Sequence, residues 1–124
     1  MEPINAKNAP AAVGPYSHAV KINDLLYCSG QIPLNKDGEV VNGSVTEQAE
    51  QVMKNIGAVL EEVGLDYSNV IKTMIFITDM NDFQDVNEVY GKYITSAPAR
   101  SCVAVKALPK GALVEVDVIA ERNN

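Results

Sequence analysis

Apolar residues recur at helical spacing between residues 44 and 63, and they form the clearest pattern in the chain. The stripe consists of Val45, Ala49, Val52, Met53, Ile56, Val59, Leu60 and Val63. A period near 3.6 residues places these side chains on one face of an amphipathic helix. Ser44 and Glu47 have the spacing of a capping box, and Gly64 stands where the end of a helix favours glycine. The sequence therefore predicts a helix over 44–63.

Shorter apolar runs predict the remaining elements. The expected strands are residues 17–22, 25–29, 70–78, 101–108 and 113–121, and a second helix covers 82–94. Asn23-Asp24 tolerates positive φ and suits a tight hairpin turn, whereas residues 1–16 are rich in Pro, Ala and Asn and predict an ordered arm or loop. The order ββαβαββ predicts an α+β sandwich with both helices on one face of a mixed sheet.

The strands predict a sheet with more apolar surface than two helices can cover. One face of strand 113–121 is uniformly apolar and consists of Val114, Val116, Val118 and Ala120. The other face mixes apolar with acidic residues and consists of Leu113, Glu115, Asp117 and Ile119. Strand 70–78 is apolar on both faces, with Ile71, Ile75 and Ile77 on one and Val70, Met74 and Phe76 on the other. A large apolar patch left in water is unfavourable, so we expect a second copy of the chain to cover the free face.

Length and composition restrict the class of protein. At 124 residues we expect one domain, residues 1–124. The net charge of −6 disfavours binding to nucleic acid or to an anionic membrane. Two cysteines and one histidine make a conventional metal site improbable, so no metal is expected. Because we find neither a signal peptide nor a membrane-spanning run, we expect a cytoplasmic protein with free thiols.

One arginine and one glutamate are the main candidates for chemistry. Arg100 lies near the start of the strand-like run Pro98–Val105, and Glu115 lies in the strongly apolar strand 113–121. We expect these two strands to be neighbours. The arginine fork can bind a carboxylate through two parallel hydrogen bonds, and a buried glutamate can carry a proton near neutral pH. From spacing alone, an ordinary ion pair between Arg100 and Glu115 is the simpler interpretation. A pocket at a subunit boundary would use both residues instead.

The other reactive side chains carry weaker signals. Cys102 has no histidine placed in sequence to activate it, so a small buried hydrophobe is the favoured interpretation, with its backbone N–H available to an anion. His18 is most simply a strand or surface residue. The chain contains neither a GxxxxGK[ST] nor a GxGxxG phosphate loop.

Several separated motifs resemble the RidA/YjgF family of reactive-intermediate deaminases. They are Ala9–Tyr16 (APAAVGPY), Ser29–Pro33 (SGQIP), Val86–Tyr90 (VNEVY), Pro98–Val103 (PARSCV) and Leu108–Lys110 (LPK). The resemblance covers nearly the whole chain, and the motifs occur in the family's order. The arginine of the PARSCV motif is typical of the branch that hydrolyses imines.

The resemblance implies a fold, a reaction and a set of roles. The fold is the chorismate-mutase-like sandwich, assembled as a homotrimer with sites between subunits and with no cofactor. The reaction is hydrolysis of 2-imino acids, formed from enamines such as 2-aminoacrylate, to 2-keto acids and ammonia. By resemblance, Arg100 binds the substrate carboxylate, Glu115 activates water, and Tyr16, Ser29, Gly30 and Cys102 complete the pocket. Asn87 matches a recurrent family residue that we assign to structure sooner than to chemistry.

Two alternative functions remain open at this point. Relatives are also described as ribonucleases or translation inhibitors, although the acidic charge and the lack of a basic, aromatic stripe disfavour RNA binding. A noncatalytic ligand-binding or holdase protein would use the same cleft or apolar face without hydrolysing an imine.

Overall fold

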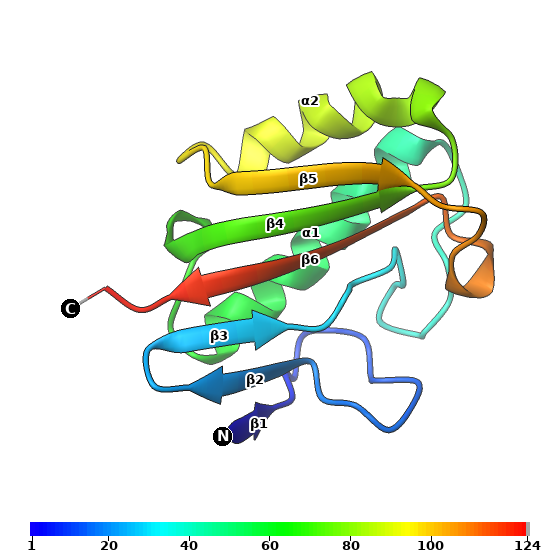
Figure 1. Ribbon diagram of the computed structural model, residues 1–124. Coiled ribbons are helices and arrows are strands. Elements are labelled where there is room, and N and C mark those ends of the chain that lie inside the picture. The colour runs from blue at the N-terminus through cyan, green and yellow to red at the C-terminus, as the bar shows by residue number, and fades with distance from the viewer. Residues whose placement is uncertain (124) are drawn as a thin grey trace.

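The computed structural model describes residues 1–123 and places two helices behind a six-stranded sheet (Figure 1). In chain order the elements are β1 (Glu2–Ile4), β2 (Ala19–Ile22), β3 (Leu25–Cys28), α1 (Val45–Glu62), β4 (Val70–Ile77), α2 (Phe83–Tyr93), β5 (Ala99–Ala104) and β6 (Val114–Glu121). The strand order is β1-β2-β3-β6-β4-β5, and all neighbours are antiparallel except the parallel pair β4 and β5. The predicted α+β architecture with both helices on one face of a mixed sheet is confirmed.

The N-terminal segment contains a strand that the sequence did not predict. We expected residues 1–16 to form an arm or loop, but β1 extends the sheet by pairing with β2, with Ile4 opposite Ala19. The strand has only three residues, including Pro3, so no period-2 pattern could reveal it. The side chain of Ile4 is buried and joins the core.

Strand β5 begins and ends earlier than the predicted range 101–108. Its extent is set by its partner, because β4 ends at Ile77 and the register pairs Ile77 with Ala104. One further hydrogen bond, from the N–H of Val105 to the carbonyl of Ile77, ends the ladder at 2.8 Å. Residues after Val105 have no strand to pair with, although their apolar composition suits one.

Helix α1 has the capped ends that the sequence predicts. The side chain of Ser44 accepts the N–H of Glu47 at 3.3 Å, and the Glu47 carboxylate accepts the N–H of Ser44 at 3.3 Å. At the other end Gly64 adopts φ +75°, and the N–H of Leu65 donates to the carbonyl of Leu60 at 3.0 Å. These bonds satisfy backbone groups that a helix leaves free at its termini. The predicted capping box is confirmed.

A β-bulge near the start of β4 corrects one predicted face. The register shifts between Val70 and Lys72, so the alternation of side chains is interrupted there. Val70 is therefore buried in the core, whereas Ile71 is 44% exposed. We had placed Ile71 on the same face as Ile75 and Ile77, which was wrong because strict alternation does not survive a bulge.

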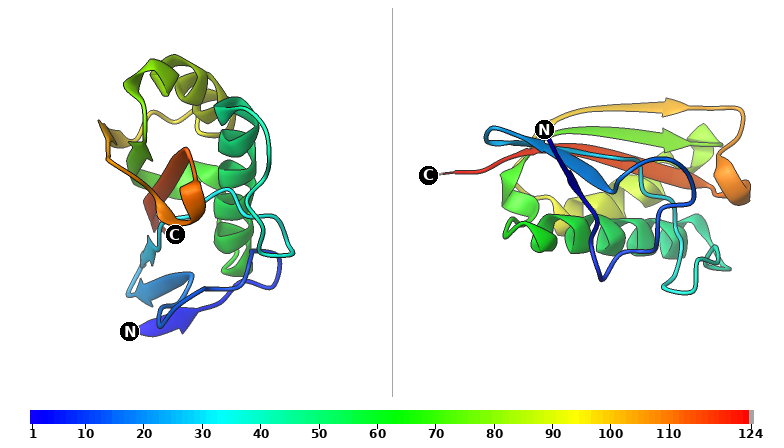
Figure 2. Two further views of the ribbon diagram at one scale, coloured as in Figure 1. Left: turned by 90° about the vertical axis from the view of Figure 1, so that its right-hand side faces the viewer. Right: turned by 90° about the horizontal axis from the view of Figure 1, so that it is seen from below.

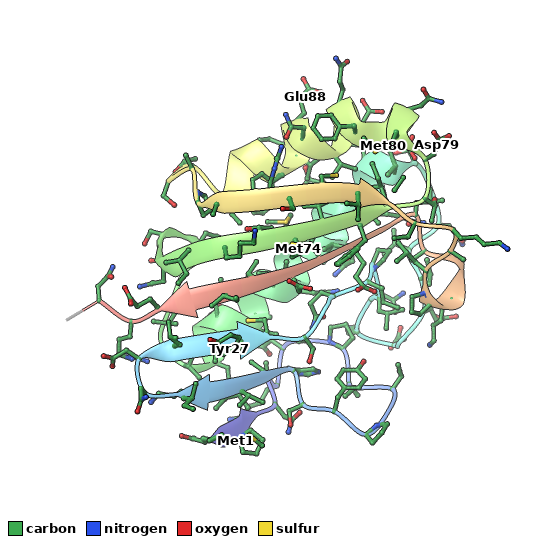
Figure 3. All side chains as sticks on the ribbon, viewed as in Figure 1. Met1, Tyr27, Met74, Asp79, Met80 and Glu88 are labelled. Atoms are coloured by element: carbon green, nitrogen blue, oxygen red, sulfur yellow. The ribbon has the colours of Figure 1, made fainter. Side chains whose placement is uncertain are left out.

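The helices cover one face of the sheet and leave the other open (Figure 2). The covered face holds the main core, to which α1, α2 and alternate residues of β4 and β6 contribute. On the open face Tyr27 is 45% and Val103 43% exposed, and Figure 3 shows Tyr27 and Met74 on the side of the sheet that faces the viewer. Apolar side chains thus remain in contact with solvent across several strands, as the sequence pattern indicates.

A buried asparagine on α1 holds the segment that follows β3. The Nδ2 of Asn55 donates to the carbonyls of Ile32 at 3.2 Å and Leu34 at 3.0 Å, and the side chain is 3% exposed. On the opposite side of this segment, Gln31 exchanges backbone hydrogen bonds with Val116 of β6. The turn after β3 is therefore fixed between α1 and β6.

Replacing this asparagine tests how firmly the segment is held. In Asn55→Leu two buried carbonyls lose their donor, so we expect the free energy of unfolding to fall by about 2–4 kcal/mol. Gln51→Ala is the matched control, because it removes only the part-buried bond from Gln51 Nε2 to Asn55 Oδ1, and it should cost less than about 1 kcal/mol. Urea denaturation measures both. Equal stability of Asn55→Leu and the wild type would contradict this role.

Candidate functional site

Arg100 lies on the edge strand β5 with its side chain on the face that the helices cover. Its register partner on β4 is Thr73, whose side chain is fully buried on that face. The guanidinium Cζ lies 5.1 Å from the ring centroid of Tyr90 and 5.7 Å from that of Phe83. Its Nη1 also donates to Oδ1 of Asn87. Because a guanidinium is attracted to aromatic faces, α2 holds this side chain in one orientation at the edge of the sheet.

Among residues 1–123, the guanidinium of Arg100 has no carboxylate partner. Within residues 1–123 the ion pair joins Lys92 to Glu50, at 2.7 Å. A guanidinium carries five N–H donors, and the side-chain hydrogen bond to Asn87 uses one of them. The ion pair between Arg100 and Glu115, which spacing alone favoured, is therefore not formed. Donors of Arg100 remain available to an anion that comes from outside the chain.

Strand β5 also presents backbone donors along the free edge of the sheet. The N–H of Val105 points to β4, and successive N–H groups of a strand point alternately to its two sides. The N–H of Cys102, three residues earlier, therefore points to the free edge. The thiol of Cys102 packs against the core, where burial raises its pKa while Arg100 acts in the opposite direction. The backbone N–H of Cys102 is thus available as a donor, whereas burial disfavours its thiolate.

Glu115 lies on β6, on the open face of the sheet, beside Gly30. A Cβ atom added to Gly30 would lie 2.5 Å from Oε2 of Glu115, so only glycine lets the carboxylate occupy this place. Burial raises the pKa of Glu115, and the neighbouring carboxylate of Asp117 raises it further. Asp117 lies two residues along the same face of the strand, and burial raises its pKa too, while Lys72 lowers it. Glu115 can therefore hold a proton closer to neutral pH than an exposed glutamate.

Ser29 directly precedes Gly30 in the chain, and Tyr16 lies in the segment before β2. The Ser29 hydroxyl donates to the carbonyl of Ser17 at 2.7 Å, which ties the end of β3 to the segment before β2. Tyr16 is 45% exposed, and its hydroxyl accepts the N–H of Val13 at 3.4 Å. The tyrosine therefore lies over its own loop with much of the ring open to solvent. The second set of candidate residues comes from β6, the turn after β3 and the N-terminal segment: Glu115, Ser29 and Gly30, and Tyr16.

A single chain does not bring the two sets of candidate residues together. We expected Arg100 and Glu115 on neighbouring strands, but β4 lies between β5 and β6. Glu115 pairs with Phe76 and lies on the open face, whereas Arg100 lies on the helix face. Side chains on opposite faces of a sheet are separated by the sheet itself. A pocket that contains both side chains therefore requires two copies of the chain.

Comparison with known proteins identifies the family. A family model described as Endoribonuclease L-PSP matches residues 6–122. The chain belongs to the RidA/YjgF family. A mouse relative named 2-iminobutanoate/2-iminopropanoate deaminase is 47% identical over 119 residues, which cover 94% of this chain and 88% of the mouse protein.

Solved structures of this RidA/YjgF fold include proteins described in different ways. A putative endoribonuclease from Thermotoga maritima superposes with a TM-score of 0.96 at 40% identity, covering 100% of this chain and 99% of that one. TdcF from E. coli, solved with bound serine, gives a TM-score of 0.93 at 38% identity, covering 99% of this chain and 100% of that one. The family is thus shared by proteins described as deaminases and as endoribonucleases.

The contacts of Arg100 with α2 and the burial of His18 were not predicted from the sequence. Phe83, Asn87 and Tyr90 contact Arg100 from one face of α2, and their spacing of four and three residues is the signal that could have found them. Tyr90 also belongs to the main core, and Asn87, which we assigned to structure, hydrogen-bonds the guanidinium. His18 is also corrected: it is buried, with both ring nitrogens hydrogen-bonded, and is not a surface residue.

The described residues offer no evident metal centre. Nowhere in residues 1–123 do three or more His, Cys, Asp or Glu side chains come together in a group that could bind a metal ion. In the same range, no helix is long and apolar enough to cross a membrane.

The influence of Asp117 on Glu115 can be measured directly. Because the Asp117 carboxylate raises the pKa of Glu115, Asp117→Asn should lower that pKa. Carboxyl carbon shifts followed by NMR through a pH titration report the change. Asp37→Asn, on a surface turn, is the control and should leave the titration of Glu115 unchanged. An unchanged or higher pKa of Glu115 in Asp117→Asn would contradict the assignment.

Proposed function

We propose that this protein hydrolyses reactive 2-imino acids, such as 2-iminobutanoate and 2-iminopropanoate, to 2-keto acids and ammonia. The observation that carries the proposal is Arg100, a guanidinium oriented by α2 that has no carboxylate partner within residues 1–123. An oriented arginine fork at a free sheet edge suits a small carboxylate ligand. The deaminase name of the mouse relative supports the same substrate class.

The proposed site is completed by a neighbouring subunit. One protomer supplies Arg100 and the backbone N–H of Cys102, and its neighbour supplies Glu115, Gly30, Ser29 and Tyr16. The open apolar face, with exposed Tyr27 and Val103, provides the surface for association. We expect the assembly to be a homotrimer, in which each pair of adjacent subunits forms one site.

The proposed chemistry needs orientation and one proton carrier. Arg100 binds the substrate carboxylate and holds C2 of the imine toward Glu115 of the neighbour. Glu115 takes a proton from water as the water oxygen bonds to C2, and it returns that proton to the nitrogen. Glu115 then takes the proton of the carbinolamine hydroxyl and passes it to the nitrogen as the C2–N bond breaks and the C=O bond forms, so that imine and water yield keto acid and ammonia. A carboxyl group whose pKa is raised suits both steps.

An activity assay tests this function through Arg100. An amino-acid oxidase generates the imino acid, and keto-acid formation is followed above the spontaneous rate. Arg100→Ala should lose about 2–5 kcal/mol of transition-state stabilisation, because a charge-assisted bidentate contact disappears. Arg100→Lys keeps the charge but loses the fork, so it should recover only part of the rate. Lys36→Ala, an exposed cation on a surface turn, is the control for loss of one positive charge.

Two outcomes would contradict the proposal. Wild-type protein that does not accelerate imine hydrolysis removes the deaminase function, and full activity in Arg100→Ala removes the proposed role of that side chain. Assaying the same preparations against RNA examines the alternative function that the Thermotoga maritima relative suggests. Saturable RNA cleavage without imine hydrolysis would favour that alternative.

A further inference from the structure

The buried His18 ring connects two backbone segments in one defined protonation state. Its Nδ1 accepts the N–H of Ala6 at 2.9 Å, and its Nε2 lies 2.6 Å from the carbonyl oxygen of Pro10. An amide N–H can only donate and a carbonyl can only accept, so Nδ1 is bare and Nε2 carries the hydrogen. The side chain is 3% exposed, so water cannot readily replace either partner. The neutral Nε2–H tautomer is therefore the form that fits this site.

The backbone of His18 connects the same arm to the residues of the candidate site. Its N–H donates to Oδ1 of Asn5 at 3.4 Å, and its carbonyl accepts the N–H of Ser29 at 2.9 Å. Ser29 in turn donates through its hydroxyl to the carbonyl of Ser17. The arm Asn5–Pro10, the start of β2 and the end of β3 are thus tied together at one residue. Tyr16 lies two residues before this point and Gly30 one residue after Ser29.

We infer that His18 is a positioning residue, whose neutral ring clamps the arm Asn5–Pro10 and thereby holds Tyr16 and Ser29 in place in the substrate pocket. The role of the pocket in binding substrate rests on the proposed function, whereas the hydrogen bonds that form the clamp do not. A second proton on the ring would place an N–H at Nδ1, facing the N–H of Ala6. That hydrogen bond would be lost and two donors would oppose each other, so the clamp holds only while the ring is neutral.

Charged neighbours do not replace the two backbone partners. The titratable groups on the segments that meet at His18 are Glu2 of β1, Lys7 of the arm, Lys21 of β2, and Tyr27 and Cys28 of β3, and Glu62 of α1 contacts the arm at Lys7. The N–H of Lys7 donates to the Glu62 carboxylate at 3.1 Å. Within residues 1–123 the ring nitrogens bond only Ala6 and Pro10. The ring therefore acts on the arm through these two hydrogen bonds.

A pair of variants separates the hydrogen bonds from the volume of the side chain. His18→Gln keeps one acceptor and one donor at a similar separation, whereas His18→Phe fills the space and bonds neither segment. In full-length protein, ring ¹⁵N shifts of the wild type should show the neutral Nε2–H tautomer. Exchange of the Ala6 amide should be about tenfold faster in His18→Phe than in the wild type, as for one lost hydrogen bond. In His18→Gln it should remain within about twofold.

The enzymatic readout distinguishes a positioning role from a merely structural one. We expect His18→Phe to raise KM about tenfold with a smaller change in kcat, and His18→Gln to keep both near the wild-type values. Unchanged KM in a folded His18→Phe, or equal losses in both variants, would overturn the inference.

Failure of the proposed function can be told apart from failure of the clamp. If wild-type protein shows no deaminase activity, the affinity for 2-oxobutanoate, measured by NMR titration on the same three proteins, replaces KM. A tenfold weaker Kd in His18→Phe alone then supports the inference, whereas equal Kd values, or no binding by the wild type, overturn it. If His18→Phe does not fold, a wild-type ring that carries its hydrogen on Nδ1, or an Ala6 amide that exchanges about tenfold faster in His18→Gln than in the wild type, overturns it.

Discussion

The fold depends on one constraint: two helices cover only one face of a six-stranded sheet. Burial of the covered face builds the core, and the opposite face keeps apolar side chains such as Tyr27 and Ile71 in contact with water. The same sheet separates Arg100 from Glu115 and leaves each without the other in a single chain. Stability and chemistry therefore lead to the same inference, because a second copy would both cover the open face and complete the pocket.

The two halves of the proposed site are prepared in different ways. The guanidinium of Arg100 is held rigidly by Asn87 and two aromatic rings, so little further ordering is needed when an anion binds. Glu115 is instead prepared electrostatically, because burial and the Asp117 carboxylate raise its pKa and so make its carboxylate a stronger base. Gly30 has no side chain and so leaves room for the Glu115 carboxylate. In the proposed mechanism, one half supplies fixed geometry, the other supplies a proton carrier, and hydrolysis needs both.

The sequence predicts the parts of the structure that depend on local periodicity. The helix 44–63 with its caps could be read directly, because capping and amphipathicity depend on residues a few positions apart. The end of β5 could not be predicted in this way, because pairing with β4 determines it. The bulge at Ile71 could not be predicted either, because the apolar alternation of β4 looks regular in the sequence. For the site, the motifs supply Arg100 and Glu115, but their separation by β4 follows from topology, which one-dimensional spacing does not contain.

Subunit complementation tests most directly the central claim that the site is built from two copies. Arg100→Ala and Glu115→Gln, each inactive alone, are mixed in equal amounts, unfolded and refolded together, and mass spectrometry verifies the mixed oligomers. If each site takes Arg100 from one subunit and Glu115 from the next, random mixing in a cyclic assembly restores roughly a quarter of wild-type deaminase activity. Mixed oligomers with no more activity than the two parent variants would contradict the claim.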